Sequence, residues 1–267
     1  MYQIGLSTCG KNINDDLFRN FRDAGLSAME ISTAPENHLK LDWDSISEMS
    51  KRYNIKLWSY HLPFQPFENL DISVKGLAKN TVAYFSELIG RACDVGINKV
   101  IIHPSGEPIA EDERCERVEC AKESLFSIAE TAKSYGAELV VENLPRTCLG
   151  RDSKEIQELI GAHKNLRVCF DTNHLLTEDL CSFIHRFKDK IVTVHISDYD
   201  FIDEKHWLPG EGKINWKEIL KAFSDIEYQG VWMYELYFTN PKVIVRKRDL
   251  NCMDISENAK KMFSGKI

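Results

Sequence analysis

Acidic and imidazole side chains stand at the ends of apolar runs in this sequence of 267 residues. A carboxylate or an imidazole beside a buried strand costs free energy unless it is paired or binds a metal ion. One such residue alone is more often a hydrogen-bonded structural group, but six of them in one chain favour a metal site. The six are His61 in SYHLPF, His103 in VIIHPSG, Glu142 in VVENLPR, Asp171 in VCFDTNH, His195 in TVHISDYD and Glu235 in MYELY.

Four of these residues, Glu142, Asp171, His195 and Glu235, make up the principal ligand set that we predict. They come from four consecutive apolar runs. In a barrel of parallel strands they would therefore lie around one half of the mouth. Three carboxylates and one imidazole form a mostly oxygen site, which suits Mn²⁺, Mg²⁺ or Co²⁺, with Zn²⁺ as an alternative. The sequence thus predicts one divalent metal ion as cofactor.

A second group of ligand-type residues accompanies the first. His61 and His103 belong to it, and His174 follows Asp171 by three positions in DTNH. Glu204 and His206 stand two residues apart in EKHWLPGEG, so both can point to the same side of an extended segment. Two interpretations stay open for this group, a second metal site and a set of substrate contacts. A further alternative for Glu204 is that it is an acidic loop residue in contact with solvent and has no role in binding.

Other side chains are candidates for substrate binding. Arg146 follows Glu142 closely and is placed near an anionic or hydroxyl-rich substrate, against the alternative of a surface salt bridge. Aromatic residues near the same ends of the strands can form the walls of a sugar-binding pocket, although aromatic side chains are more often part of the hydrophobic core. This set is Trp58, Tyr60, Phe64, Phe67, Trp207 and Tyr237. His38, His163 and His185 stand among polar residues, and we predict that they lie on the surface.

The elements that must position these residues are short apolar strands that alternate with helices. Helical spacing is clearest in the stripe from Val118 to Ala132, and glycines such as Gly25 and Gly230 stand where helix caps are expected. Eight strand and helix units in one chain fit a single (β/α)₈ TIM barrel domain over residues 1–267, since such barrels have ~250 residues. A doubly wound sheet is the alternative, but no G-x-G-x-x-G follows the first run. The strands are predicted at 2–7, 28–32, 56–61, 99–103, 138–142, 166–171, 191–197 and 230–235.

Composition narrows the class of protein. The chain carries 34 basic and 41 acidic residues, a net charge of −7, which argues against nucleic acid as its main partner. No apolar run is long enough for a membrane span, and the first residues lack the pattern of a secretory signal, so we expect no membrane partner and a cytoplasmic location. The eight scattered cysteines are expected to be free thiols. Signatures of P-loop, G-x-S-x-G and H-E-x-x-H enzymes do not occur.

The motifs together resemble those of a known superfamily. They are HLPF, IIHPSG, VVEN, CFDTNH, HISD, HWLPGEG and YELY, in that order. With these motifs the chain resembles the xylose isomerase-like TIM barrels, a superfamily that holds sugar phosphate isomerases and epimerases, ketose 3-epimerases, inosose dehydratase and endonuclease IV. The resemblance implies that the principal set, Glu142, Asp171, His195 and Glu235, binds the divalent ion and that His174 contacts substrate.

The resemblance also implies an alternative with three metal ions. The endonuclease IV pattern has further zinc ligands that match His61, His103 and His174, together with an acid-x-His pair. This chain has Glu204 and His206 for that pair, with Glu in place of Asp. The ketose 3-epimerase pattern has an arginine six residues after the strand-seven histidine, where this chain has Phe201. We therefore expect a relative of these epimerases that acts on another polyol or on a sugar acid.

The function predicted from these residues is a metal-dependent isomerase or epimerase of a sugar, sugar phosphate or polyol. Glu142 and Glu235 would move a proton next to a carbonyl while the metal ion stabilises an enediolate. An inosose dehydratase-like lyase and an endonuclease IV-like phosphodiesterase on abasic DNA are the alternatives. The expected mouth segment HPSGEPIAEDER has one basic residue and four acidic ones, which disfavours DNA. The predicted partner is a small sugar or polyol, and a homo-oligomer stays open.

Overall fold

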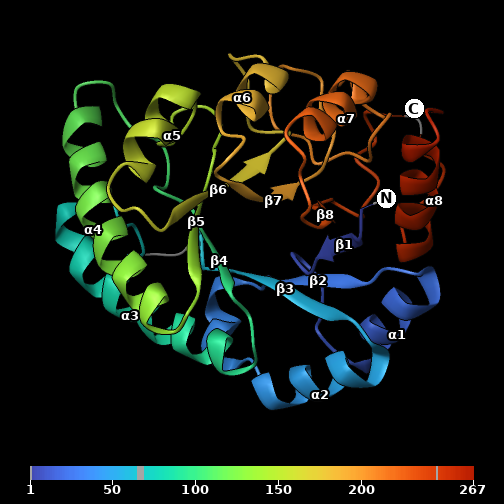
Figure 1. Cartoon of the computed structure of the whole chain (residues 1–267), viewed down its shortest axis with the longest axis horizontal. Coiled ribbons are helices and arrows are strands. Elements are labelled where there is room, and N and C mark those ends of the chain that lie inside the picture. The colour runs from blue at the N-terminus through green and yellow to red at the C-terminus, as the bar shows by residue number, and fades with distance from the viewer. Residues whose placement is uncertain (1, 65–68, 245) are drawn as a thin grey trace.

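The chain folds as a (β/α)₈ TIM barrel in this computed structural model, which describes residues 2–64, 69–244 and 246–267. Parallel strands form the barrel and helices surround it (Figure 1). The strands are β1 (Ile4–Ser7), β2 (Ala28–Ile31), β3 (Lys56–His61), β4 (Lys99–Ile102), β5 (Glu138–Glu142), β6 (Leu166–Asp171), β7 (Ile191–His195) and β8 (Trp232–Tyr234). The helices are α1 (Asp15–Ala24), α2 (Trp43–Tyr53), α3 (Lys75–Asp94), α4 (Arg114–Ser134), α5 (Ser153–Ile160), α6 (Leu180–Arg186), α7 (Trp216–Asp225) and α8 (Cys252–Phe263), with a 3₁₀ helix at Pro35–Lys40. The predicted fold is confirmed.

Strand order follows chain order, and the barrel is nearly closed. Each strand from β1 to β6 pairs in parallel with the next, and β8 pairs with β1. Contacts just beyond β7 join it to β8: the Ile196 N–H donates to the Met233 carbonyl at 2.8 Å, and the Ile196 carbonyl accepts from the Glu235 N–H at 3.2 Å. This junction lies at the carboxyl ends of the strands, where the predicted ligands stand.

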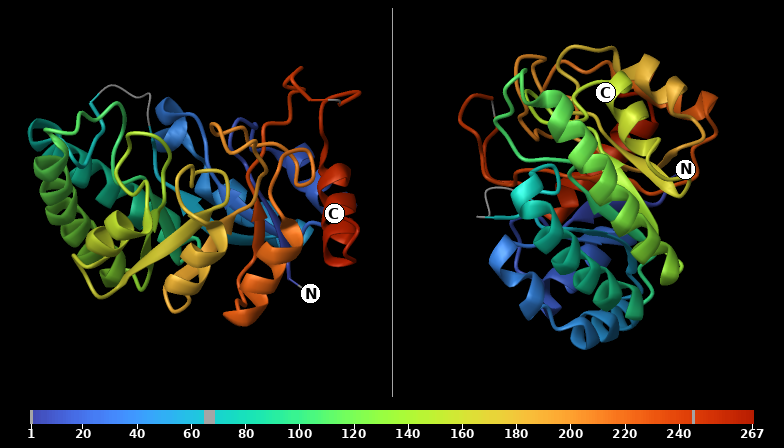
Figure 2. Two further views of the ribbon diagram at one scale, coloured as in Figure 1. Left: turned by 90° about the horizontal axis from the view of Figure 1, so that it is seen from above. Right: turned by 90° about the vertical axis from the view of Figure 1, so that its left-hand side faces the viewer.

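Two layers of apolar side chains hold the fold together. The larger layer lies between the strands and the helices, and the predicted stripe of α4, with Val118, Leu125 and Ile128, is buried in it. Inside the barrel lie two smaller clusters, one around Trp58 and Met233 and the other of Ile101, Val140 and Cys169. The loops that follow the strands gather at one end of the barrel, seen at the top of the left view in Figure 2.

A β-bulge in β3 turns its last residues toward the barrel interior. Glu30 of β2 pairs with Ser59, and Trp58 is an extra residue that the register passes over. Trp58 packs in the interior cluster, and the next side chain, Ser59, also points inward, where its Oγ donates to Glu30 Oε2 at 2.7 Å. Because the alternation of a strand restarts after a bulge, His61 then faces the interior as well.

A second bulge has the same effect in β7. The register between β6 and β7 passes over Val192, so that Cys169 pairs with Thr193 and Asp171 with His195. Thr193 Oγ1 accepts a hydrogen bond from the Trp58 indole across the barrel at 3.0 Å, which shows that Thr193 faces the interior. His195 follows two residues later and therefore faces the interior too. The two bulges thus aim one imidazole each at the mouth.

Some local predictions need correction. Gly25 caps α1 with a φ of 75°, as expected, but Gly230 is no helix cap, because α7 ends at Asp225. A side chain at Gly230 would instead collide with the ring of Tyr228, since a Cβ would lie 2.2 Å from its hydroxyl oxygen. Strands β1, β2, β4, β7 and β8 are one to three residues shorter than predicted at one or both ends. All eight cysteines are free, as predicted.

Two of the histidines predicted on the surface are buried. His38 is 1% exposed, because its Nδ1 accepts from the Tyr60 hydroxyl at 2.6 Å and its Nε2 donates to the Thr33 carbonyl at 3.0 Å. His163 is 9% exposed and contacts Glu130 at 2.7 Å. The third, His185, is exposed as predicted. In the described part of the chain, helices with the length and apolar character of a membrane span do not occur.

Candidate metal centre

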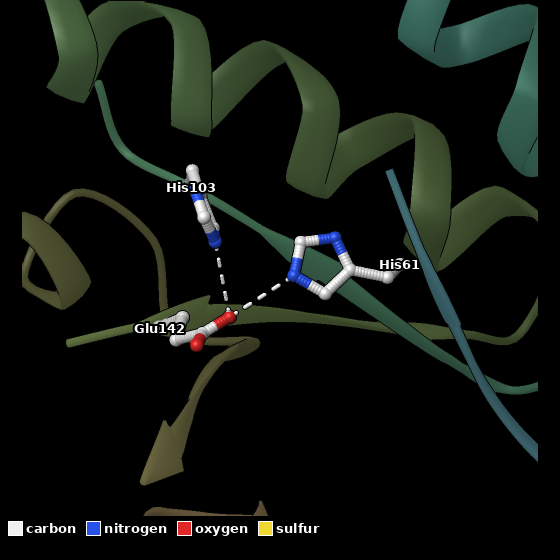
Figure 3. Close-up of side chains that lie close together, drawn as sticks. All are labelled: His61, His103 and Glu142. Carbon is white, nitrogen blue, oxygen red and sulfur yellow. Dashed lines mark hydrogen bonds and ion pairs between the residues drawn. The ribbon is translucent and has the colours of Figure 1, made fainter. Parts of the chain in front are cut away.

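Glu142 is the carboxylate that the candidate metal ligands share. It ends β5 and has no exposed surface. Its Oε2 lies 3.1 Å from His61 Nε2 and 3.3 Å from His103 Nε2, and Figure 3 shows both rings directed at this oxygen. Its Oε1 lies 3.1 Å from His195 Nδ1. One carboxylate group therefore joins histidines from β3, β7 and the end of β4.

The principal ligand set predicted from the sequence comes together around His195. Its Nδ1 lies 3.3 Å from Glu235 Oε2 and 3.8 Å from Asp171 Oδ2, besides its contact with Glu142. Ligand atoms of all four residues lie within 4.8 Å of one another, and the residues are buried. Asp171 ends β6, His195 ends β7 and Glu235 directly follows β8. The ends of adjacent strands therefore converge on one point, as a parallel barrel requires.

The donor set fits a divalent cation. Three buried carboxylates this close would repel one another without a compensating positive charge. Among the described residues, Asp171 Oδ2 has no hydrogen-bond partner, although it is buried. Ligands about 2.1 Å from a tetrahedral zinc ion lie about 3.4 Å apart, near the separations of Glu142 (3.1 Å) and Glu235 (3.3 Å) from His195. An ion bound here would satisfy the unpaired oxygen and the excess of negative charge.

A third group of ligand-type residues lies next to the principal one. His174, Glu204 and His206 have ligand atoms within 4.8 Å of one another, and His174 Nε2 lies 3.4 Å from Glu204 Oε2. The other nitrogen of His174 lies 3.4 Å from Glu142 Oε1, so this group adjoins the shared carboxylate. Asn173 holds the loop, because its Oδ1 accepts from the His206 N–H at 3.3 Å. The structure thus brings all nine predicted ligand-type residues into three adjacent groups.

Backbone carbonyls orient three of these imidazoles. His61 Nδ1 donates to its neighbour's carbonyl at Leu62 (2.7 Å), His174 Nδ1 donates to Asn143 (2.9 Å), and His206 Nδ1 is 3.3 Å from the Glu235 carbonyl. Because a carbonyl oxygen only accepts, each Nδ1 carries the proton. The Nε2 of each ring is then available as a ligand, an arrangement typical of histidines that bind metals.

Burial and charge shift the acid–base properties of the centre. Burial raises the pKa of Asp171 to about 6, although His174 and His206 oppose the shift. Burial also acts on Glu142, but His195 and His103 outweigh it and hold the pKa of that carboxyl well below its usual range. The pKa of His174 is raised well above its usual value, because Asp171 and Glu142 overcome the effect of burial. The centre therefore favours a positive charge between its carboxylates.

A cavity of about 340 Å³ opens onto the three groups. Glu142, Glu235 and His174 line it, together with the aromatic residues Phe64 and Tyr237. Three other aromatic residues that were predicted to line a sugar pocket do not line this cavity, and the fourth lies outside the described residues. Trp58 belongs to the barrel interior, Tyr60 to the layer under the helices, and Trp207 is 8% exposed and pairs through its backbone with Asp198. Phe67 lies outside the described residues.

Arg146 lines the same cavity, and carboxylates surround its guanidinium. Nη1 lies 2.8 Å from Asp203, Nη2 lies 3.2 Å from Glu204, and Nε donates to Glu107 at 3.0 Å. The arginine therefore ties the loop after β4 to the loop after β7. Its predicted contact with substrate stays a prediction, as does that of Trp207.

Two residues of the centre were not among the predicted ones, Glu30 and Cys169, whose Sγ lies within 4.8 Å of ligand atoms of Glu142 and His195. Glu30 of β2 is fully buried, and its carboxylate lies 3.1 Å from His195 Nε2. The available signal was an acid inside the short run AMEI, where a side chain must be buried on one face of the sheet or the other. Glu30 is not the last residue of the run, so a prediction based on the residues at strand ends does not include it.

Comparison with known proteins finds relatives of this chain at low sequence identity. An uncharacterized protein of Methanocaldococcus jannaschii, MJ1311, is 28% identical over 195 residues, which cover 70% of this chain and 66% of that protein. Fructoselysine 3-epimerase of Escherichia coli O157:H7 is 26% identical over 136 residues, or 47% of this chain and 49% of the epimerase. The chain thus spans just under two thirds of the first relative and about half of the second.

Solved structures share the whole fold. A D-tagatose 3-epimerase-like protein superposes with a TM-score of 0.81 at 24% identity, covering 100% of this chain and 98% of the other. D-Psicose 3-epimerase of Clostridium cellulolyticum H10 gives 0.76 at 17% identity, with coverages of 100% and 98%. At these identities the likeness shows the fold alone. The family pattern described as "Xylose isomerase-like TIM barrel" matches residues 18–252, and the chain therefore belongs to the xylose isomerase-like TIM barrel family.

Proposed function

We propose that this protein is a metal-dependent sugar isomerase or epimerase. The observation that carries the proposal is the buried group of Glu142, Asp171, His195 and Glu235, of which Glu142 and Glu235 line a cavity. The names of the similar proteins, fructoselysine 3-epimerase, D-psicose 3-epimerase and a D-tagatose 3-epimerase-like protein, support the same class. The cavity volume of about 340 Å³ suits a small substrate of the size of a monosaccharide derivative.

The proposed reaction removes a proton from the carbon next to a carbonyl. A divalent ion in this centre supplies Lewis-acid stabilisation of the negative charge that develops on the substrate oxygen. Glu142 and Glu235 extend from β5 and from the end of β8, and both line the cavity. Either carboxylate can take the proton, and either can return it. Return to the opposite face of the same carbon gives an epimer, and return to the neighbouring carbon gives an isomer.

The walls of the cavity support this role. Phe64, Leu144 and Tyr237 contribute apolar surface beside the carboxylates. Apolar walls reduce contact between water and the reacting carbon, which strengthens the electrostatic interactions in the site. Arg146, already held by Glu107, Asp203 and Glu204, then acts as part of the wall that fixes the loops.

Proton exchange in D₂O tests the proposal directly. The purified protein, loaded in turn with Mn²⁺, Co²⁺ and Zn²⁺, is incubated with ketoses, aldoses, their phosphates, sugar acids and inosose derivatives. Deuterium incorporation next to the carbonyl of at least one compound is expected. At saturating metal, Glu142→Gln and Glu235→Gln should abolish it, whereas Glu111→Gln, which alters a carboxylate paired with Arg151 on the surface, should not. Equal exchange rates in all variants would refute the assignment of the bases.

Hydrolysis of a phosphodiester is the second candidate, and one observation favours it. The three adjacent ligand groups share or adjoin Glu142, an arrangement that can hold more than one metal ion. Against it stands the charge at the mouth, where Arg146, Arg151 and Arg246 each pair with acidic residues. Metal-dependent incision of a duplex with an abasic site, with binding that weakens steeply as salt rises, would establish this function instead.

A further inference from the structure

We propose that Glu30 is a positioning residue that fixes His195 as a metal ligand through Nδ1, and that it thereby sets the metal affinity of a centre to which it contributes no ligand. The inference rests on the metal site of the proposed function and concerns a residue outside the predicted ligand set. It does not depend on which substrate the protein converts. Metal binding can therefore test it apart from catalysis.

His195 lies between carboxylates on both sides of its ring. Its Nδ1 faces Glu142 at 3.1 Å and Glu235 at 3.3 Å, whereas its Nε2 lies 3.1 Å from Glu30. Both nitrogens face carboxylates, which only accept hydrogen bonds when ionised, but the candidate ligands gather on the Nδ1 side alone. A cation bound there would take the place of the Nδ1 proton and leave the Nε2–H to donate to Glu30. The lone pair that can bind a cation is then the one on Nδ1, which points toward Glu142, Asp171 and Glu235.

Glu30 is held in position by its neighbour in the sheet, Ser59. The bulge in β3 sets Ser59 opposite Glu30, and the Ser59 hydroxyl donates to Glu30 Oε2 at 2.7 Å. Neither side chain has exposed surface. Glu30 reaches His195 across the barrel interior, from β2 to β7, and these strands are not neighbours in the sheet. A carboxylate held this way restricts rotation of the imidazole about its side-chain bonds.

The other imidazoles of the centre differ from His195 in the partner of their outer nitrogen. His61, His174 and His206 direct Nδ1 at a backbone carbonyl, so each presents Nε2 to the centre. His195 has the opposite orientation, and its outer partner is an anion instead of a neutral carbonyl. A carboxylate partner makes the imidazole a more basic ligand, and loss of such a partner typically weakens metal binding by about 10–100-fold. The structural alternative is that Glu30 and His195 form only an ion pair that stabilises the barrel.

Zinc titration of the full chain distinguishes these alternatives. The dissociation constant for Zn²⁺ is measured by competition with a chromogenic chelator, and the Co²⁺ absorption spectrum reports the ligand geometry. Glu30→Gln keeps the volume and removes the charge, and we expect a loss of zinc affinity of about 10–100-fold with a changed Co²⁺ spectrum. Glu155→Gln is the matched control, because Glu155 is a largely buried carboxylate that pairs with Arg114 and lies apart from the ligand groups. The zinc affinity of Glu155→Gln should equal that of the wild type.

A measurement on the wild type covers the case in which Glu30→Gln does not fold. With ¹⁵N-labelled histidine, the zinc-loaded protein should show His195 with a protonated Nε2 and an unprotonated, metal-shifted Nδ1. Ser59→Ala, which removes one hydrogen bond to Glu30, should weaken zinc binding severalfold. The opposite tautomer of His195, unchanged affinity in Glu30→Gln, or equal losses in Glu30→Gln and Glu155→Gln would each overturn the inference.

The same data separate this inference from the proposed function. If the wild type binds zinc, Glu30→Gln binds it more weakly and no carbohydrate exchanges a proton, the positioning role holds and the isomerase proposal fails. If proton exchange occurs and Glu30→Gln binds zinc as the wild type does, the reverse is true. A wild-type protein that binds no zinc, cobalt or manganese would overturn both.

Discussion

The lower interior of the barrel and its mouth are built from the same strands and have opposite energetics. In the lower interior, Ala28, Trp58, Val231 and Met233 pack as an apolar cluster. At the mouth, the ligand atoms of three carboxylates and a histidine lie within 4.8 Å of one another. Apolar burial stabilises the first region by roughly 25 cal/mol per Å². Burial of charge destabilises the second unless a cation balances it.

The apolar lower interior and the charged mouth are only two residues apart along a strand. Val140 precedes Glu142 in β5 by two positions, and Met233 precedes Glu235 in the same way. Side chains two residues apart in a strand share a face, so β5 and the end of β8 each have an apolar residue below and a candidate metal ligand above. Stability and chemistry can therefore be altered separately, and variants matched along one strand test this separation.

The largest contrast is expected for Glu142→Ala and Val140→Ala, two positions on the same face of β5. Glu142→Ala should lower zinc affinity by more than the 10–100-fold typical for loss of an outer partner, because its carboxylate contacts His61, His103 and His195. Val140→Ala should leave zinc affinity unchanged. Elemental analysis after dialysis and chelator competition provide the measurements. Similar zinc contents in the two variants would contradict the division into two regions.

A smaller but still large effect is expected for Met233→Ala. Met233 is fully buried in the lower cluster, and loss of its side chain should reduce the free energy of unfolding by about 2–5 kcal/mol. Denaturant unfolding in the presence of a chelator measures this change without the contribution of bound metal. Zinc affinity of the folded variant should match the wild type. A loss of affinity that parallels the loss of stability would show that the two regions are coupled.

His38 is a buried imidazole whose hydrogen-bond partners are Tyr60 and Thr33, in contrast to the imidazoles at the mouth, which contact carboxylates. Burial lowers the pKa of His38 to about 4, assisted by the charge of His61. The folded protein thus holds His38 neutral, while the unfolded chain binds a proton near pH 6.5. Its contribution to stability is present above pH 6.5 and is lost as the pH falls toward 4, by up to about 3 kcal/mol. Urea unfolding from pH 7 to pH 4 should show a shallower loss in His38→Gln than in the wild type, and parallel curves would refute this.

The strand-end residues were predictable from the sequence for a physical reason. In a barrel of parallel strands every carboxyl end lies at the same mouth, so chain order alone places Glu142, Asp171, His195 and Glu235 together. Their types then indicate a cation site, because buried carboxylates need compensation. The fold followed from the alternation of short apolar runs with helical stripes such as that of α4.

Other features depend on contacts that the sequence does not display. The bulges at Trp58 and Val192 change the inward face of β3 and β7, and strict alternation does not predict them. Glu30 lies within an apolar run and meets its partner His195 across the barrel, 165 residues later. His38 looked like a surface residue among polar neighbours, but Tyr60, 22 residues away, completes its hydrogen bonds. Long-range partners, and not local composition, decide these positions.

The smallest effect on stability is expected at the rim, for Arg146→Gln. The guanidinium is partly exposed, and so are the carboxylates of Glu107, Asp203 and Glu204 with which it pairs. Exposed ion pairs contribute about 0–1 kcal/mol, so the free energy of unfolding should change by less than about 1 kcal/mol. Denaturant unfolding measures this value, and a loss above 2 kcal/mol would mean that the rim supports the fold as the lower interior does.

The same variant decides whether Arg146 acts on substrate or on the loops. An arginine that binds substrate directly should raise KM when it is replaced, because a charge-assisted hydrogen bond contributes about 1.5–3 kcal/mol, or about 10–150-fold. An arginine that only holds Glu204 in place should leave KM nearly unchanged and lower the affinity for a metal ion at His174, Glu204 and His206. Steady-state kinetics and zinc stoichiometry of Arg146→Gln separate the two roles. Glu111→Gln, which removes a comparable ion pair with Arg151, is the control and should change neither quantity.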